Sequence, residues 1–194
     1  LSLHDALPIL QGFGWEKGAF GMVDDIDHSI LSSIGQTFAW IFSPLGWGDW
    51  KAAVASATGL IAKENVVATF GQLYGFAEVA EEGNEFWGQL SASFTPLAAY
   101  SFMVFNLLCA PCFAAMGAIK REMNNTKWFW IAIGYQCGFA YVCSLIVYQL
   151  GSLFNGGSFG FGTIVGFILL IGLIYLLVRP SKESDTAEVE FAVK

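Results

Sequence analysis

The sequence predicts an all-α, polytopic membrane helix bundle with about five membrane segments, one of which is broken by a proline. Of its 194 residues, 55% are hydrophobic and only 13% are charged, whereas a soluble domain carries about 25% charged residues. Residues 86–119 and 128–178 contain no Asp, Glu, Lys or Arg. Because a bilayer-spanning helix needs about 20 apolar residues, the second of these stretches has room for two spans.

The predicted segments follow one another along the chain. Residues 1–28 are expected to be an external N-terminal segment whose first ten residues are non-native, residues 29–179 a transmembrane permease region, and residues 180–194 a polar cytoplasmic tail. The expected membrane segments are 29–48, 50–76, 94–119, 128–150 and 163–178. The first two are more polar than the others, so the sequence leaves open whether residues 29–76 cross twice or re-enter.

Positive charges predict the orientation of these segments. Lys120, Arg121 and Lys127 occupy one connection, and Arg179 and Lys182 follow two spans later on the same side. Lys and Arg are retained in cytoplasmic loops. We therefore expect an outside N-terminus and an inside C-terminus.

Charge and motifs exclude two classes of protein. The net charge of -7 is the wrong sign for a nucleic-acid partner. There is no Ser-His-Asp order, phosphate-binding loop or dinucleotide fingerprint, so no catalytic site is predicted. The four cysteines lie in apolar runs, where free thiols are more typical than a disulfide framework.

Two adjacent charges stand near the middle of the second segment, Lys63 and Glu64. An ionisable side chain at membrane depth costs a few kcal/mol, which indicates a pathway or a specific partner. Adjacent helical residues point about 100° apart, so each needs its own partner. We expect Glu64 to face an aqueous ion pathway as a ligand or charged gate, and Lys63 to fix a neighbouring helix terminus or carboxylate. The alternative is a pair of structural bridges.

A sulfur-rich stretch surrounds the proline of the third segment. Pro111 cannot donate to the carbonyl four residues before it, so we expect a kinked or broken helix with free backbone oxygens. On one continuous helix, Cys109, Cys112 and Met116 would share a stripe, with Asn106 at its edge. Such ligands suit Fe(II), Zn(II) or Cu(I). Sulfur side chains that only pack, or a thiol redox pair, are the alternatives.

Other small residues are expected to serve packing. Cys137 and Cys143 would lie on separate faces of one helix and are interpreted as packing residues. Glycines four residues apart let helices approach closely in lipid. The chain has two such pairs, Gly134–Gly138 and Gly162–Gly166.

Several collinear motifs resemble the FeoB family of bacterial ferrous iron transporters. The first are residues 46–51 (GWGDWK), 59–69 (GLIAKENVVAT) and 71–75 (GQLYG). Downstream, the motifs at 94–97, 101–105, 111–112 and 118–122 are similar to the second Gate region of that family. The resemblance covers roughly residues 20–180.

The resemblance implies Fe(II) transport across the bacterial cytoplasmic membrane. It matches the Pro-Cys pair of the family's Gate regions to Pro111 and Cys112, which makes Cys112 the first choice of ligand, assisted by Cys109 and Met116. Glu64 is the expected further ligand or gate.

It also implies partners that this sequence does not contain. These are an N-terminal GTP-binding domain and a first Gate region, so the chain is expected to be a C-terminal fragment that is not itself an enzyme and depends on GTP only through that domain. The bilayer and a homo-oligomer are further expected partners. Two other functions stay open: a non-transporting membrane scaffold, and an organic-solute carrier, because Gate segments also resemble nucleoside permeases.

Overall fold

The structure is a computed structural model that describes residues 12–16, 19–22, 26–60, 63, 65–75, 87–157 and 159–179. Most of these residues are helical. The helices are α2 (Ile30–Phe42), α3 (Trp50–Gly59), α4 (Asn65–Leu73), α5 (Trp87–Ser93), α6 (Pro96–Leu108), α7 (Phe113–Met123), α8 (Thr126–Phe154) and α9 (Phe161–Val178). Two 3-10 turns, η1 (Ile26–His28) and η2 (Ser43–Leu45), flank α2.

A short hairpin corrects the all-α prediction. Strand β1 (Phe13–Glu16) pairs antiparallel with β2 (Ala19–Met22), with Phe13 opposite Met22 and Gly14 opposite Gly21. Aromatic residues in these two four-residue runs favour extended backbone. The runs are too short to show either a helical or a strand period clearly in the sequence.

Three helical stretches are long and apolar enough to cross a membrane among the described residues: Pro96–Met123, Thr126–Phe154 and Phe161–Val178. They correspond to the three most apolar predicted segments. The two more polar segments form shorter helices instead, since α2 has 13 residues, α3 has 10 and α4 has 9. The described residues thus contain three candidate membrane spans, where the sequence predicted about five membrane segments.

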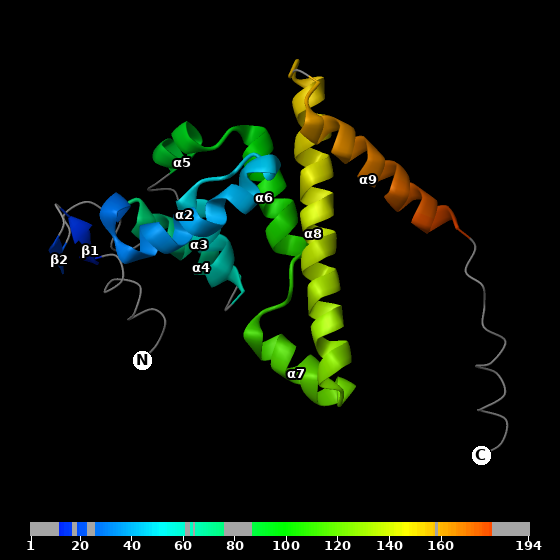
Figure 1. Cartoon of the computed structure of the whole chain (residues 1–194), viewed down its shortest axis with the longest axis horizontal. Coiled ribbons are helices and arrows are strands. Elements are labelled where there is room, and N and C mark those ends of the chain that lie inside the picture. Colours follow the sequence, from blue (N-terminus) through cyan, green and yellow to red (C-terminus); the bar gives the residue numbers. More distant parts are fainter. Residues whose placement is uncertain are drawn as a thin grey trace.

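Helix α8 is the central column of the molecule (Figure 1). Helix α6 packs along it on one side and α9 on another, while α2, α3 and α4 pack on one another beyond α6. Helix α7 lies near the lower end of α8 in this view. This arrangement places α2, α3 and α4 beside α6, which belongs to the segment that contains Pro111.

Aromatic side chains fill the space between these helices. Trp47 is 2% exposed and stacks on Phe42, with the ring centroids 4.4 Å apart. Phe102 of α6 meets Trp47 edge-on at 5.0 Å and Phe70 of α4 at 5.5 Å. This cluster joins α4, α6 and the chain that follows η2 into one core.

A buried serine pair connects α6, α8 and η2. The Ser101 hydroxyl donates to the Leu45 carbonyl at 2.9 Å, and its oxygen lies 2.7 Å from that of Ser144. The Ser144 hydroxyl donates to the Ser101 carbonyl at 2.8 Å. Both serines are 0% exposed. Each hydroxyl therefore has a partner, as burial away from water requires.

Two further side chains of α8 bind the backbone around η2. The Tyr141 hydroxyl donates to the Ile41 carbonyl at 2.8 Å. The Gln149 side-chain amide donates to the Pro44 carbonyl at 2.8 Å. Carbonyl groups at a helix end lack helical partners, so α8 supplies two of the donors around this turn and α6 supplies another through Ser101.

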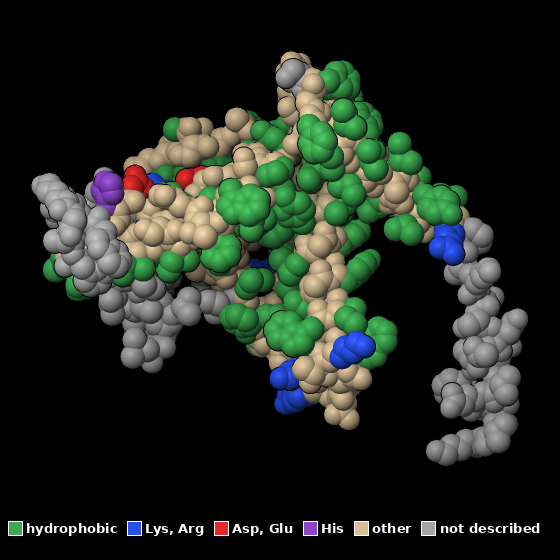
Figure 2. Space-filling view, viewed as in Figure 1, with side chains coloured by type: hydrophobic (Ala, Val, Ile, Leu, Met, Phe, Trp, Pro, Cys, Tyr) green, Lys and Arg blue, Asp and Glu red, His purple; other side chains and the backbone are tan. Residues whose placement is uncertain are grey.

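The surface of α8 and α9 is strongly apolar. Figure 2 shows hydrophobic side chains along both helices, and Phe161, Ile168 and Leu177 are among the exposed ones. An exposed apolar surface of this extent is unusual for a soluble monomer but suits helices that face lipid. The orientation predicted from the positive charges stays a prediction.

Candidate functional site

The predicted break at Pro111 is confirmed. Helix α6 ends at Leu108 and α7 begins at Phe113, and the backbone between them is extended, with ψ of 168° at Cys109 and 159° at Cys112. The Cys112 carbonyl then accepts the Met116 amide at 2.9 Å, so Cys112 is the N-cap residue of α7. Because proline has no N–H, it cannot close a helical turn here.

A second break faces the first. Helix α3 ends at Gly59 and α4 begins at Asn65. The Lys63 ammonium of this connection donates to the Leu107 carbonyl at 3.2 Å, which is the carbonyl that a helical residue 111 would have bound. In return, the Phe113 amide donates to the Leu60 carbonyl at 3.1 Å.

The two breaks therefore satisfy each other's backbone. The first amides of a helix and its last carbonyls have no helical partner, and non-helical backbone at membrane depth is tolerated only where protein or a water-filled cavity surrounds it. Here one hydrogen bond runs from the α3–α4 connection to the α6–α7 break, and one runs the other way. The interrupted helix here is α6–α7, and discontinuous helices of this kind form substrate sites in many transporters.

Small and polar side chains hold the two breaks close together. The Thr58 and Thr69 hydroxyl oxygens are 3.0 Å apart, which links the end of α3 to α4. A Cβ atom at Gly59 would lie 2.7 Å from Val66 and 3.3 Å from the Asn106 side-chain oxygen. Only a glycine lets α3, α4 and α6 approach this closely. The Asn106 amide donates to the Phe102 carbonyl at 2.9 Å, so Asn106 is held on its own helix.

The sulfur stripe is not continuous, which corrects one sequence prediction. The 100° spacing that placed Cys109, Cys112 and Met116 together holds only within an unbroken helix, and the extended residues separate Cys109 from α7. Cys109 and Met116 still pack against one cluster, which also includes Cys137 of α8. Cys112 lies outside that cluster, half-buried at the start of α7.

Cys137 is the residue that sequence reasoning missed. Its sulfur lies 3.5 Å from that of Cys109, and both side chains are half-buried free thiols. The two residues are 28 positions apart on different helices. No spacing within one element could have indicated this contact, since it depends on how α6 packs against α8.

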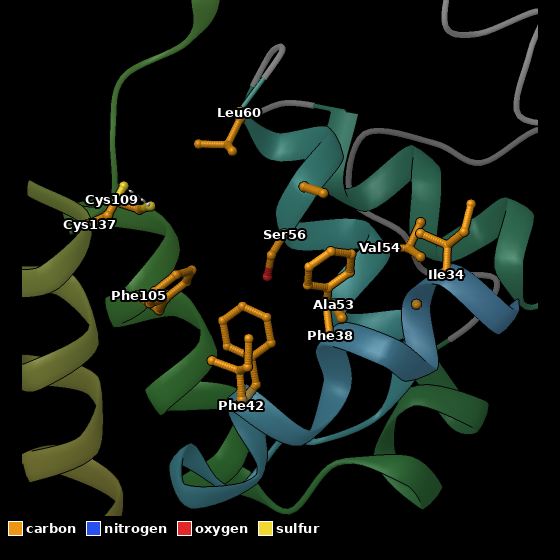
Figure 3. A pocket seen from close by; sticks show the side chains of 13 residues that line it. Ile34, Phe38, Phe42, Ala53, Val54, Ser56, Leu60, Phe105, Cys109 and Cys137 are labelled. Atoms are coloured by element: carbon orange, nitrogen blue, oxygen red, sulfur yellow. Dashed lines mark hydrogen bonds between the residues drawn. The ribbon is translucent and has the colours of Figure 1, made fainter. Parts of the chain in front are cut away.

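A cavity of about 400 Å³ opens beside the two thiols. Its lining comes mainly from apolar side chains of α2, α3 and α6, with Cys109 and Cys137 at one edge (Figure 3). The Ser56 hydroxyl of α3 points into this space. Ser56 is 7% exposed and its hydroxyl has no hydrogen-bond partner among the described residues.

The structure says less about the two predicted charged site residues, Lys63 and Glu64. Glu64 lies outside the described residues. The Lys63 side chain is exposed and reaches the end of α6, as its bond to Leu107 shows. Within the part of the chain that the structure describes, no three His, Cys, Asp or Glu side chains gather as a metal-binding group.

Comparison with known proteins identifies the family to which the chain belongs. The sequence profile of the Gate family, described as nucleoside recognition, matches residues 8–126. The chain belongs to the Gate family. The match ends at the start of α8, so this Gate region includes both helix breaks and Cys109, whereas Cys137 lies beyond the matched residues.

Curated relatives of this Gate region are ferrous iron transporters by name. Fe(2+) transporter FeoB of Staphylococcus aureus (strain COL) is 35% identical over 137 residues, which cover 71% of this chain and 20% of that protein. FeoB of Methanocaldococcus jannaschii is 39% identical over 128 residues, covering 66% and 18%. FeoB of Escherichia coli O6:H1 is 26% identical, covering 87% and 28%. No solved structure matches significantly.

These matches make the chain a multi-pass Gate region of the FeoB type. It spans about one fifth of the length of the first curated relatives. The resemblance drawn from the sequence motifs is therefore confirmed at the level of the family.

Proposed function

We propose that this chain forms part of the pathway by which a FeoB-type transporter moves Fe(II) across the bacterial cytoplasmic membrane. The observation that carries the proposal is the contact between the break of α6–α7 and the connection from α3 to α4, at which the Lys63 ammonium donates to the Leu107 carbonyl. A carbonyl oxygen that accepts from a cationic group at membrane depth is also suited to a passing metal cation.

Cys112 would act as the main sulfur ligand in this pathway. It is the N-cap residue of α7, an 11-residue helix, and its side chain makes no capping hydrogen bond there. A thiolate is the form of cysteine that binds metals. Fe(II) accepts sulfur and oxygen ligands together, so Cys112 and the free carbonyl oxygens of the break would form an incomplete shell that releases the ion again.

The other predicted residues would have supporting roles. Cys109, Met116 and Glu64 would offer further ligands along the pathway, while Pro111 keeps the break open. Lys63, which binds the end of α6, and Asn106, which lies beside Gly59 of α3, would act as gating residues. The GTP-binding domain and first Gate region that the family resemblance implies would belong to the same protein and drive or complete the pathway.

The test is Fe(II) uptake by cells that express the full-length protein. We expect Cys112→Ser to lower the uptake rate about ten-fold or more, as the loss of a metal ligand should. Cys143→Ser on α8 is the matched control, since Cys143 is also a half-buried thiol. Expression is matched by immunoblot. Unchanged uptake by the Cys112 variant would remove its role as a ligand.

A second candidate function follows from the description of the matched family, nucleoside recognition. In this alternative the chain belongs to a carrier of organic solutes. Competition separates the two. If iron is the substrate, excess nucleoside leaves Fe(II) uptake unchanged. If an organic solute is the substrate, excess unlabelled nucleoside blocks the uptake of a labelled nucleoside. A protein that carries neither solute would instead be a membrane scaffold whose cysteines only pack.

A further inference from the structure

We propose that Cys109 and Cys137 form a two-thiolate site for a soft divalent metal ion at the edge of the cavity between α2, α3 and α6. This site is separate from Cys112 and includes a residue beyond the family match. It shares Cys109 with the proposed function and adds Cys137, and an ion can bind there whether or not the chain conducts Fe(II).

The geometry of the two sulfurs supports a shared ion. They lie 3.5 Å apart, and two sulfur ligands about 2.3 Å from one tetrahedral ion are about 3.8 Å apart. Cys109 ends α6, where its amide donates to the Phe105 carbonyl at 2.8 Å, and Cys137 lies within the uninterrupted α8. Both ligands are therefore held on fixed backbone, and little movement is needed for them to bind one ion.

Two thiolates leave positions around a metal ion open, and the cavity has room for water molecules to fill them. Its volume of about 400 Å³ has room for metal-bound water, since one water takes about 30 Å³ in the liquid. The buried Ser56 hydroxyl faces the cavity without a partner among the described residues, so it can accept a hydrogen bond from such a water. Met116 packs against the same hydrophobic cluster as the two thiols.

Charge balance selects the kind of ion. Binding converts two thiols and M²⁺ into M(SR)₂ and releases two protons to solvent, with no change in oxidation state. The resulting complex is neutral, which an apolar cavity tolerates far better than an isolated ion. Mg²⁺ and Ca²⁺ prefer oxygen ligands, whereas Zn²⁺ and Cd²⁺ prefer thiolates. The site therefore favours soft, thiophilic cations.

The experiment is a Cd(II) titration of the full chain, reduced with a phosphine and held in lipid nanodiscs. Near-ultraviolet absorbance reports thiolate-to-cadmium bonds, and a pH indicator reports proton release. We expect one high-affinity Cd(II) per chain with two protons released. Cys109→Ser and Cys137→Ser should each weaken this binding about ten-fold or more, while the control Cys143→Ser leaves it unchanged; Cys112→Ser is titrated beside them.

Thermal unfolding in the absence of metal shows whether each variant folds, and Cys137→Ala replaces Cys137→Ser if the serine does not. A titration without an absorbance band, or one in which the Cd(II) affinity is unchanged in either the Cys109 or the Cys137 variant, overturns the proposal. A band that only Cys112→Ser removes would also overturn it, but would support Cys112 as the pathway ligand, so the two proposals fail separately.

Discussion

Two irregular backbone segments lie within the helical bundle, and donors of different charge bind them. Around η2, the carbonyls of three residues accept from neutral side chains: the hydroxyls of Ser101 and Tyr141 and the amide of Gln149. At the break between α6 and α7, the Leu107 carbonyl accepts from the ammonium of Lys63. In both segments, side-chain donors pair backbone carbonyls that have no helical partner.

The difference separates a structural turn from a candidate ion site. At η2 the donors are neutral, and the Ser101 hydroxyl that binds the Leu45 carbonyl is fully buried, which leaves no place for an ion there. The Lys63 side chain is exposed, and an ammonium group can be replaced at a carbonyl by another cation. We therefore expect substitutions at η2 to affect folding and substitutions at the break to affect ion passage.

The largest effect on stability is expected from Gly46→Ala, which would distort the turn. Gly46 has a φ of +87°, and an added Cβ would overlap the Tyr148 ring of α8. Left-handed backbone costs an L-residue about 1–2 kcal/mol, and overpacking adds about 1–3 kcal/mol. Chemical denaturation in detergent should show a loss of about 2–5 kcal/mol.

Gly75→Ala is the matched control for this substitution. Gly75 also has a φ of +87°, but no described atom lies within 4 Å of the place that an added Cβ would take. It should lose only the backbone cost of about 1–2 kcal/mol. Equal losses at both glycines would show that contact between α8 and the turn does not stabilise the fold.

An intermediate effect is expected from Ser101→Ala. The substitution leaves the Leu45 carbonyl and the Ser144 hydroxyl with one partner fewer in a buried place, which costs about 1–3 kcal/mol. The control is Ser91→Ala, because the Ser91 hydroxyl bonds to Gly88 on the surface and its loss should cost about 0.5 kcal/mol or less. A negligible effect of Ser101→Ala would contradict a structural role for the serine pair.

The smallest effect on stability is expected from Lys63→Met. It removes the exposed hydrogen bond to Leu107, which is worth about 1 kcal/mol or less, but it should change Fe(II) uptake by the full-length protein several-fold. Lys127→Met, at the start of α8, is the control for loss of an exposed positive charge. If Lys63→Met destabilises the fold as much as Ser101→Ala, the break is a structural turn like η2.

Features that depend on local sequence were predictable. The three spans follow from length and hydropathy, and the break follows from the missing N–H of Pro111. The contacts that join the two breaks were not predictable, because the bonds from Lys63 to Leu107 and from Phe113 to Leu60 link residues that are far apart along the chain. The sequence indicated that Lys63 needs a partner, but only the packing of α3 and α4 against α6 identifies it.

Cysteine and glycine patterns show the same limit. Helical spacing placed Cys109 with Cys112, whereas the break turns Cys109 toward α8. The two glycine pairs look alike in the sequence. Yet Gly162 and Gly166 lie against α8 at Gln149, and nothing lies within 4 Å of a Cβ at either member of the other pair in the part of the chain described. Close approach is thus a property of neighbouring helices that spacing alone does not determine.

The length of α8 has a consequence for the surrounding bilayer. Its 29 residues rise about 1.5 Å each, so the helix is about 44 Å long, while the hydrocarbon layer is about 30 Å thick. Helix α9, with 18 residues, is about 27 Å long and nearly matches that layer. A straight α8 must therefore tilt or extend into the headgroup region, which makes the seating of this chain sensitive to membrane thickness.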